Sequence, residues 1–413
     1  MKIKIPLLSS LSILCSLNNT YAADISVKGL VDLRVHQTKN SSDNSYLTGG
    51  YGKFRYNDSG LSIGQLALQA ELEINKTWSS TLVLNAFADK GHSSIGYTEA
   101  YFKYKGLPTS NGWRVSSKIG IFYPNISLEN IATAWSSPYM LTSSTINNWV
   151  GEELRHTGLN FAVDKLGKFT NSKHTFSADI SLFQNNDTAG TLLAWHGWTI
   201  GSRQTLLHEK IAIQPFPARQ NSLSAQAPLS DPFKEIDHKF GIHSTLGWKY
   251  SNKIKASFGY YNNNTDEGLV ERGQYTWKTD FYHLGIKYRL AQQWEIITQH
   301  MQGSTFMRSP ELVKVVDVDF DSSFVMLRHF WNDHHFALRG EYFTVDDLDN
   351  LEGDNNNETG RAISLAYRYK LNKQSFVLVE QSWIDSKRPS RWYVNKPIEQ
   401  TEKQVQIGFR YYF

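Results

Sequence analysis

The sequence predicts an all-β fold, a transmembrane antiparallel β-barrel of about 16 strands. Three observations predict it. Segments of roughly ten residues alternate between apolar and polar or charged side chains, as membrane barrel strands do. Short turns and long polar loops follow one another along the chain. After residue 22 there is no run of eighteen apolar residues, so no membrane helix is expected.

The N-terminus has the three parts of a secretory signal peptide. A short basic start precedes the apolar stretch IPLLSSLSILCSL, and small residues lead to a cleavage position after Ala22. We expect residues 1–22 to be this signal peptide and residues 23–413 to form one barrel domain; a disordered or buried N-terminus is the alternative. Cys15, the single cysteine, lies in the apolar stretch, so the mature chain offers no thiol for a disulfide, a metal site or catalysis.

The alternation is clear at both ends of the barrel domain. The segment DISVKGLVDLRVH (residues 24–36) and the C-terminal QVQIGFRYYF (residues 404–413) each have one apolar and one polar face. A buried soluble sheet rarely tolerates charge on its polar face. We therefore expect the aromatic face of the last strand to meet lipid. We also expect this strand to pair with the first strand, which leaves no free edge.

The connections give the strand count and the orientation. Seven short turns alternate with eight longer polar loops, which implies about sixteen strands. Short turns on one rim and long loops on the other are typical of outer-membrane barrels, whose turns face the periplasm. The longest loop, residues 185–236, is expected to be extracellular.

Two motifs carry a resemblance to known families. Gly408, Tyr411 and Phe413 look like the C-terminal signal that the barrel-assembly machinery of the bacterial outer membrane recognises. The stretch KIGIFYPNISLENIATAWSSPYMLTSSTINNWVGEELRHTG resembles the phosphate-selective porin (O/P-like) family.

That family has a strand ending in Gly-x-(Phe)-x-x-Pro-x-x-(Leu)-Glu before its inward loop, and Gly120, Pro124, Leu128 and Glu129 match it. The resemblance implies that residues 123–152 form an inward-folded third loop, the constriction loop, and that the protein is a homotrimer. The arginine ladder and lysine cluster of the phosphate-specific members are not found in this sequence, which departs from the family pattern.

Alternation also predicts the lining of the barrel. It assigns charges of both signs to the inner face, among them Lys103, Lys118, Asp319, Asp321 and Asp385. A strongly selective filter concentrates one sign of charge at its constriction. We therefore expect weak ion selectivity.

Six charged residues lie on or beside the proposed constriction loop, and they are the predicted selectivity residues. They are Arg114, Lys118, Glu129, Glu152, Glu153 and Arg155. Opposed charges would create a transverse field that orders polar solutes. Ion pairs between the loop and the barrel wall, without any filtering role, are an equally weighted interpretation.

Two loops could bind ligands. The stretch from Thr188 to Lys210 contains Trp195, His196 and Trp198, which could stack on sugars or hold a metal but more often pack a long loop. The acidic stretch 346–358 fails as a calcium loop because Leu351 occupies a ligand position. It is expected to be a solvated surface loop, so no metal site and no cofactor is predicted.

The expected function is a porin of the bacterial outer membrane, a channel for passive diffusion of small hydrophilic solutes after export through the periplasm. A substrate-selective channel for anions such as phosphate, or for sugars, is the main alternative. A barrel hydrolase is the weakest, because no nucleophile motif accompanies His156 and Asn160, and we predict no enzyme activity. The expected partners are outer-membrane lipids, lipopolysaccharide and the assembly machinery. Nucleic acid is excluded, because the 43 Lys and Arg are scattered and nearly balanced by 39 Asp and Glu.

Overall fold

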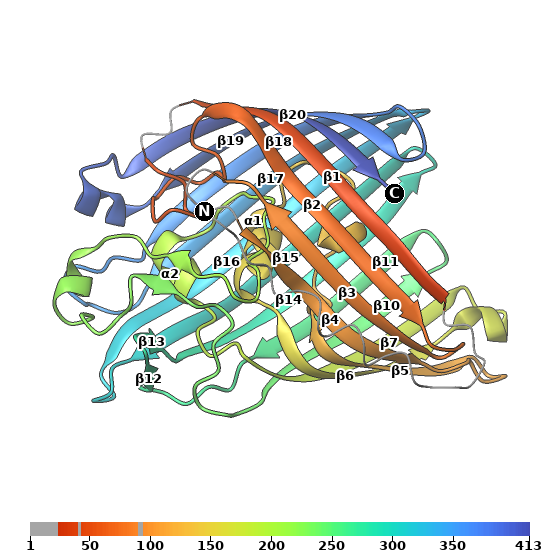
Figure 1. The fold of residues 1–413 in the computed structure, drawn as a ribbon, viewed down its shortest axis with the longest axis horizontal. Helices are drawn as coiled ribbons and strands as arrows, with labels where there is room; N and C mark the ends of the chain where they lie inside the picture. Colours follow the sequence, from red (N-terminus) through yellow and green to blue (C-terminus); the bar gives the residue numbers. More distant parts are fainter. Residues whose placement is uncertain (1–23, 40–42, 90–93) are drawn as a thin grey trace, which may run out of the picture.

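A computed structural model describes residues 24–39, 43–89 and 94–413. Within these residues, sixteen strands form one closed barrel in which neighbouring strands are antiparallel. Figure 1 shows the strands inclined to the long axis of the molecule. The predicted fold class and strand number are therefore confirmed. The predicted signal peptide, residues 1–22, lies outside the described residues.

The barrel strands follow one another around the wall in chain order. The first eight are β1 Asp24–Lys39, β2 Ser59–Glu73, β3 Trp78–Phe87, β4 Ser94–Lys105, β5 Trp113–Phe122, β6 His156–Lys165, β7 His174–Gln184 and β10 Gly241–Tyr250. The other eight are β11 Ile254–Asn262, β14 Trp277–Ala291, β15 Trp294–Arg308, β16 Lys314–Trp331, β17 His334–Asp347, β18 Glu358–Lys370, β19 Ser375–Lys387 and β20 Glu399–Tyr412.

Short elements lie in the connections. Two small hairpins are β8 Ile211–Ala212 with β9 Leu229–Ser230, and β12 Val270–Glu271 with β13 Gln274–Tyr275. The helices are α1 Thr145–Glu153, α2 Thr191–His196 and the 3-10 turns η1 Thr133–Trp135, η2 Gly167–Thr170, η3 Pro217–Gln220 and η4 Pro389–Val394. None of the helices among the described residues has the length and apolarity to cross a membrane.

The two rims differ as predicted. In Figure 1 the short turns lie at the right and the long loops, with α2, β12 and β13, at the left. We call these ends the turn side and the loop side. The third long connection, loop 3, spans residues 123–155 between β5 and β6, and the fourth, loop 4, spans residues 185–240 between β7 and β10.

The barrel closes between its first and last strands. β1 pairs with β20 from Leu30 opposite Tyr412 to Lys39 opposite Lys403. Beyond this ladder the N–H of Gly29 donates to the carbonyl of Phe413 at 2.9 Å. In β20 the side chains of Ile407 and Phe409 point outward and are half exposed, whereas those of the alternating residues Gln406 and Arg410 are buried inside. The predicted closure and the predicted lipid-facing side are both confirmed.

The inner face of β16 corrects one prediction. Here the apolar side chains, including Phe320 and Phe324, are buried inside the barrel, while Asp319 and Asp321 point outward. Asp385 of β19 also points outward. The assignment of these three carboxylates to the inner face was wrong. The apolar face of β16 turns inward because loops 3 and 4 fill the barrel there and provide apolar partners, so the inner surface is not in water.

Candidate functional site

Loop 3 enters the barrel at a sharp change of chain direction after β5. Gly120 has a φ of +129°, and a Cβ at this position would lie 2.3 Å from the carbonyl oxygen of Ala100, so the position requires glycine. Pro124 lies two residues after the last residue of β5 and restricts the backbone where the chain leaves the sheet. Ser144 caps α1 further along the loop, where its side chain accepts from the backbone of Asn147 at 3.3 Å.

A buried arginine of the barrel wall holds loop 3. Arg339 of β17 donates to Glu129 of the loop at 2.5 Å and to Glu341 of its own strand at 2.7 Å, and all three side chains are fully buried. Glu341 accepts from the backbone N–H of Thr145 at 2.8 Å. Glu380 of β19 accepts from the backbone N–H of Leu141 at 2.6 Å. The carboxylates of Glu341 and Glu380 therefore bind loop 3 and do not face an open lumen.

Aromatic packing seals the same wall. Trp149 of α1 is 2% exposed, and its ring lies 5.2 Å from Phe320 of β16 and 5.8 Å from Trp198 of loop 4. Such edge-to-face contacts add to the burial of large apolar side chains. We call the inner face of β15–β19 the covered wall, because loops 3 and 4 pack against it.

Loop 4 also folds into the barrel, which the sequence did not indicate. Trp198 donates from its backbone N–H to Glu358 of β18 at 2.8 Å and from its ring N–H to the carbonyl of Thr344 at 2.9 Å. Glu358 forms a buried ion pair with Lys53 of the first loop. Trp195, His196 and Trp198 are all buried, so they pack the loop, which is the more common of the two roles considered for them.

Glu152 and Glu153 of α1 lie beneath loop 4. Glu153 accepts from the ring N–H of Trp149 at 2.6 Å and from the backbone N–H of Leu192 at 2.9 Å, and burial raises its pKa to about 7. Glu152 lies 3.6 Å from His196. Burial raises the pKa of Glu152 well above its usual value and lowers that of His196 to about 3, so both shifts favour the neutral forms.

Arg155 is the last residue of loop 3, and its side chain lies between aromatic rings. Its guanidinium lies 4.6 Å from the ring centroids of both Tyr123 and Phe233, and it donates to the hydroxyl of Tyr123 at 2.7 Å. Tyr123 in turn stacks on Trp135 with ring centroids 4.3 Å apart. Arg155 is 1% exposed, so its charge is held within the loop packing.

Open space remains on the turn side of loop 3. A cavity of about 490 Å³ lies between this loop and the opposite wall, whose strands are β4–β7, β10 and β11. Its lining includes Lys103, Lys118, Asn160, Asp179 and Lys255. We call the turn-side half of this wall the open wall. Of the six predicted selectivity residues, Lys118 faces this cavity.

Arg114 lies nearer the turn side on the same strand as Lys118. Its guanidinium forms an ion pair with Asp164 of β6 at 2.6 Å. The ammonium group of Lys118 lies 5.1 Å from the ring centroid of Tyr101 and forms no ion pair with a described residue. Thus the structure separates the six predicted residues into Lys118 in the cavity, Arg114 beside it, and four buried groups that hold loop 3. Whether they filter solutes stays a prediction.

Hydrogen bonds within the acidic loop 346–358 and to loop 4 hold this loop in place. Asp347 accepts from the backbone N–H of Asn356 at 2.8 Å. Asp354 is buried and accepts from the ring N–H of Trp195 at 3.1 Å, and burial raises its pKa to about 7. Part of this loop therefore supports loop 4, whereas the sequence predicted a solvated loop throughout.

Three carboxylates of loop 4 lie close together. Within the described residues, Asp187, Glu235 and Asp237 bring one oxygen each within 4.8 Å of the others. Asp187 accepts from the backbone N–H of Ile236 at 2.5 Å and from that of Asp237 at 3.1 Å. These bonds shape the end of the loop, and burial raises the pKa of Asp187 to about 7.

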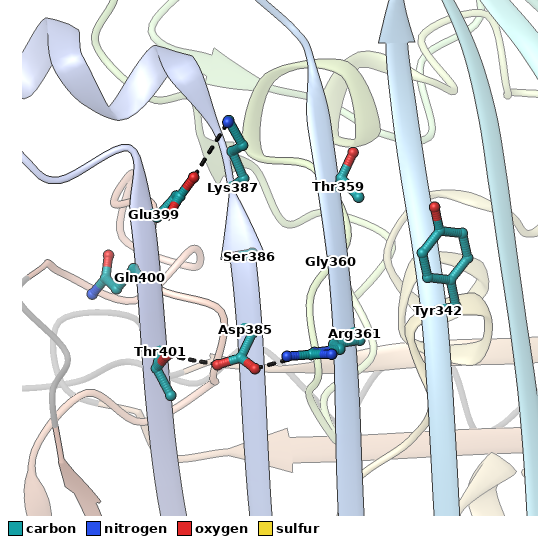
Figure 2. A pocket seen from close by; sticks show the side chains of 10 residues that line it. All are labelled: Tyr342, Thr359, Gly360, Arg361, Asp385, Ser386, Lys387, Glu399, Gln400 and Thr401. Carbon is teal, nitrogen blue, oxygen red and sulfur yellow. Dashed lines mark hydrogen bonds and ion pairs between the residues drawn. The ribbon is translucent and has the colours of Figure 1, made fainter.

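The outer surface has a groove that the sequence did not predict. Figure 2 shows this groove of about 420 Å³ on β17–β20, near the loop side. Arg361 forms an ion pair with Asp385 at 3.3 Å, and Lys387 forms one with Glu399 at 3.2 Å. The groove lies outside the barrel, so it is not part of a path through it.

The predicted assembly signal has local structural contacts. A Cβ at Gly408 would lie 2.6 Å from Leu141 of loop 3, so this glycine provides space for the loop. The ring of Phe413 lies over Gly29 of β1, and its centroid is 5.9 Å from that of Tyr411. Recognition of these residues during assembly stays a prediction.

Comparisons with known proteins agree with this architecture. Residues 219–413 match the model of a family described as "Putative beta-barrel porin-2, OmpL-like". No curated protein matches the chain in sequence.

Among solved structures, the anion-selective porin from Comamonas acidovorans is 12% identical, with a TM-score of 0.55 over 95% of this chain and 100% of that chain. The outer membrane channel DcaP of Acinetobacter baumannii is 11% identical, with a TM-score of 0.55 over 95% of this chain and 97% of that chain. The trimer form of OmpT from Vibrio cholerae is 9% identical, with a TM-score of 0.52 over 95% of this chain and 100% of that chain. These similarities establish a porin fold. The narrower resemblance to phosphate-selective porins stays a prediction.

Proposed function

We propose that the chain is an outer-membrane porin, a water-filled channel through which small hydrophilic solutes diffuse passively. The observation that carries this proposal is the polar cavity of about 490 Å³ inside a closed barrel. Its lysines, asparagine and aspartate would be costly to enclose in a dry interior. Large apolar side chains such as Leu338, Ile363 and Leu365 are exposed on the outward face of the barrel, as contact with lipid requires.

The solute path runs along the polar side of the barrel. On the loop side of the cavity, loop 3 meets β2–β4 through amide and hydroxyl groups. Gln65 donates to Asn85 at 2.7 Å and to the carbonyl of Ala134 at 3.2 Å, and Asn85 donates to Thr98 at 2.8 Å. Water and polar solutes can replace such hydrogen bonds at little net cost, whereas they cannot replace the aromatic contacts of the covered wall.

The predicted selectivity residues then have two roles. Lys118 contacts solutes in the cavity, while Glu129, Glu153 and Arg155 keep loop 3 inside the barrel. The loop-to-wall ion pair between Glu129 and Arg339 supports, for this residue, the alternative that the sequence left open. Channel selectivity is set by the open wall.

Conductance tests the proposal directly. Protein refolded in detergent and added to planar bilayers should give stepwise currents that increase with salt concentration. Bilayers that stay silent, although the protein shows the heat-modifiable migration of a folded barrel, would overturn the channel function.

A hydrolase is not supported by the surroundings of the candidate base. His156 is fully buried, and its ring stacks on Phe183 at 4.2 Å and lies edge-on to Phe122 at 5.7 Å. The same purified protein should show no lipid or peptide hydrolysis above a heat-denatured control. Hydrolysis that disappears in His156→Ala would reinstate the enzyme.

We place the protein in the bacterial outer membrane as a homotrimer that contacts lipid and lipopolysaccharide and is inserted by the barrel-assembly machinery. The porin fold and the trimer form printed for OmpT of Vibrio cholerae support the trimer. Chemical cross-linking of whole cells should trap three copies, and a pure monomer under the same conditions would exclude the assembly.

A further inference from the structure

Three lysines lie side by side on the inner wall, on the turn side of loop 3. Lys249 of β10 is directly opposite Lys255 of β11, and Lys255 is directly opposite Lys287 of β14. All three face inward, because the residues that alternate with them, such as Leu246 and Leu284, are exposed on the outer face. Like charges directly opposite one another destabilise a sheet, so the position of this row of three lysines is better explained by a function than by stability.

Two of the lysines have no ion-pair partner among the described residues. Lys287 forms an ion pair with Glu295 at 3.2 Å, and the same carboxylate is shared with Arg328. Lys249 and Lys255 form no ion pair with any residue that the structure describes. Arg289 adds a further positive charge at this rim.

Glu295, Asp164 and Asp179 line the same space as this row, and each already has a hydrogen-bond or ion-pair partner. Asp164 pairs with Arg114 at 2.6 Å. Asp179 accepts from Asn125 at 3.2 Å and from Asn160 at 3.4 Å. The positive side chains that line this space, Lys249, Lys253, Lys255, Lys287 and Arg289, outnumber these carboxylates, so the described lining keeps a net positive charge. Asp319, Asp321 and Asp385 do not offset it because they lie outside the barrel.

An apolar roof faces the lysines. Leu128 and Ile131 of loop 3 line the same space as Lys249 and Lys255. Leu128 sits against Gly285 of β14, where a Cβ would lie 2.9 Å from its Cδ1. Ile131 is 53% exposed, although it lies in a polar barrel interior. An exposed apolar side chain opposite unpaired cations can contact both the hydrocarbon part and the anionic group of one ligand.

The space between roof and wall consists of two adjoining cavities of about 240 and 220 Å³, both lined by Leu128, Lys249 and Lys255. We propose that this space is a binding site for small organic carboxylates. The carboxylate contacts Lys249 and Lys255, and its hydrocarbon part lies against Leu128 and Ile131. The inference rests on the proposed channel function, since solutes reach the site through the lumen.

Organic carboxylates fit better than inorganic oxyanions. Phosphate would use the lysines alone and gain nothing from the roof, whereas each methylene buried against the roof adds apolar contact. The site therefore predicts that anion affinity increases with chain length. Each added methylene should tighten binding by up to roughly fourfold.

Block of single-channel current measures this preference. Acetate, butyrate, hexanoate and inorganic phosphate are added in turn to the wild-type channel in KCl. Hexanoate should block at the lowest concentration and acetate and phosphate at the highest. Block by phosphate at the same concentration as hexanoate would overturn the organic-carboxylate site.

Variants separate the contribution of the lysines from that of the apolar roof. In K249Q/K255Q, block by hexanoate should weaken by about tenfold or more, since two charge-assisted contacts are lost. Ile131→Ser should flatten the dependence on chain length and leave phosphate unchanged. The control K168Q/K173Q also removes two positive charges, from the exposed turn between β6 and β7. Hexanoate should block this variant at the same concentration as the wild type. Equal block in K249Q/K255Q and wild type would exclude the lysine row.

Calorimetry distinguishes failure of the site from failure of the channel. Hexanoate is titrated into the refolded protein in detergent, with K249Q/K255Q as the reference. Heat of binding that is lost in K249Q/K255Q supports the site even if bilayers are silent, in which case the channel function alone is overturned. A conducting channel that binds no hexanoate overturns the site alone.

Discussion

The covered wall and the open wall belong to the same barrel but have opposite chemistry. On the covered wall, buried charges end in ion pairs, as Arg339 does with Glu129 and Glu341, and apolar rings such as Phe320 pack on loop 3. On the open wall, lysines such as Lys118 and Lys255 form no ion pair with a described residue and face a cavity whose lining also includes Glu99 and Asp179. The difference shows that the inserted loops, and not the barrel alone, decide which inner residues meet water.

This comparison explains why charge cannot be counted over the whole inner face. Charges under loops 3 and 4 neutralise one another within the packing and contribute little field to the lumen. Charges on the open wall act at close range on a solute, in a space where water is limited. Four predictions test this division, from the largest expected effect to the smallest.

Removing the centre of loop 3 should have the largest effect. Residues 130–144 can be replaced by two glycines, because the retained flanks lie close together: Glu129 accepts from the side-chain amide of Asn147 at 3.0 Å. Without this segment less of the lumen of the sixteen-stranded barrel is filled, and single-channel conductance should increase by roughly twofold or more. Unchanged conductance in a folded barrel would place the constriction elsewhere.

Arginines on the two sides of the barrel should differ strongly. Arg339→Ala leaves Glu129 and Glu341 buried without their cation, which should lower the free energy of unfolding by about 3–5 kcal/mol. Arg361→Ala removes an ion pair with Asp385 from the outer groove, where the arginine side chain is 79% exposed, and should cost at most about 1 kcal/mol.

Urea unfolding followed by tryptophan fluorescence measures both variants. Arg339→Ala should also produce noisier current, since loop 3 loses its anchor. Equal losses of stability in the two variants would contradict the distinction between the packed interior and the solvated outside.

The packing of loops 3 and 4 should depend on pH. Burial raises the pKa of Glu153, Asp187 and Asp354 to about 7. A carboxyl group with a raised pKa binds its proton more tightly in the packed state. Its stabilisation of that state is therefore complete at low pH and is lost as the pH rises from about 4.5 through 7.

Conductance should thus be higher and more variable at pH 8.5 than at pH 5.5. Glu153→Gln keeps the group neutral at all pH values and should reduce this difference. Glu352→Gln, on the surface of the acidic loop, is the matched control. A conductance that falls as pH rises would contradict the assigned direction.

The features that the sequence predicted are local or repetitive. The alternation in residues 404–413 is sufficient to predict a strand with one face in lipid, and repeated short turns are sufficient to count strands. Gly120 and Pro124 locate the start of loop 3 through their resemblance to the family motif: Gly120 adopts a positive φ that other residues rarely adopt, and Pro124 restricts the backbone. The barrel, its closure and its inward loop could therefore be predicted.

The features that could not be predicted depend on distant partners. Glu129 pairs with Arg339, 210 residues away, and no pattern near either residue indicates this contact. In the same way, β16 alternates regularly, but the alternation alone does not say which face points inward. That choice follows from Trp149 and Trp198, which provide apolar partners inside the barrel. Four of the six predicted selectivity residues are buried for the same reason.

The C-terminal residue should show the smallest effect on the folded protein. Phe413 lies over Gly29 on the outer face, away from both inner walls, and it is 45% exposed. Its complete burial would be worth only ~1.5–3 kcal/mol, and the strand is also held by a continuous ladder to β1. Phe413→Ala should therefore fold in detergent and conduct as wild type.

In cells we expect a different result, because the assembly machinery acts on the unfolded strand before barrel stability exists. Low outer-membrane levels with periplasmic degradation should follow, measured by fractionation and immunoblotting. Normal surface levels would show that the terminal aromatic is dispensable for assembly, and failure to fold in detergent would show that its role is structural.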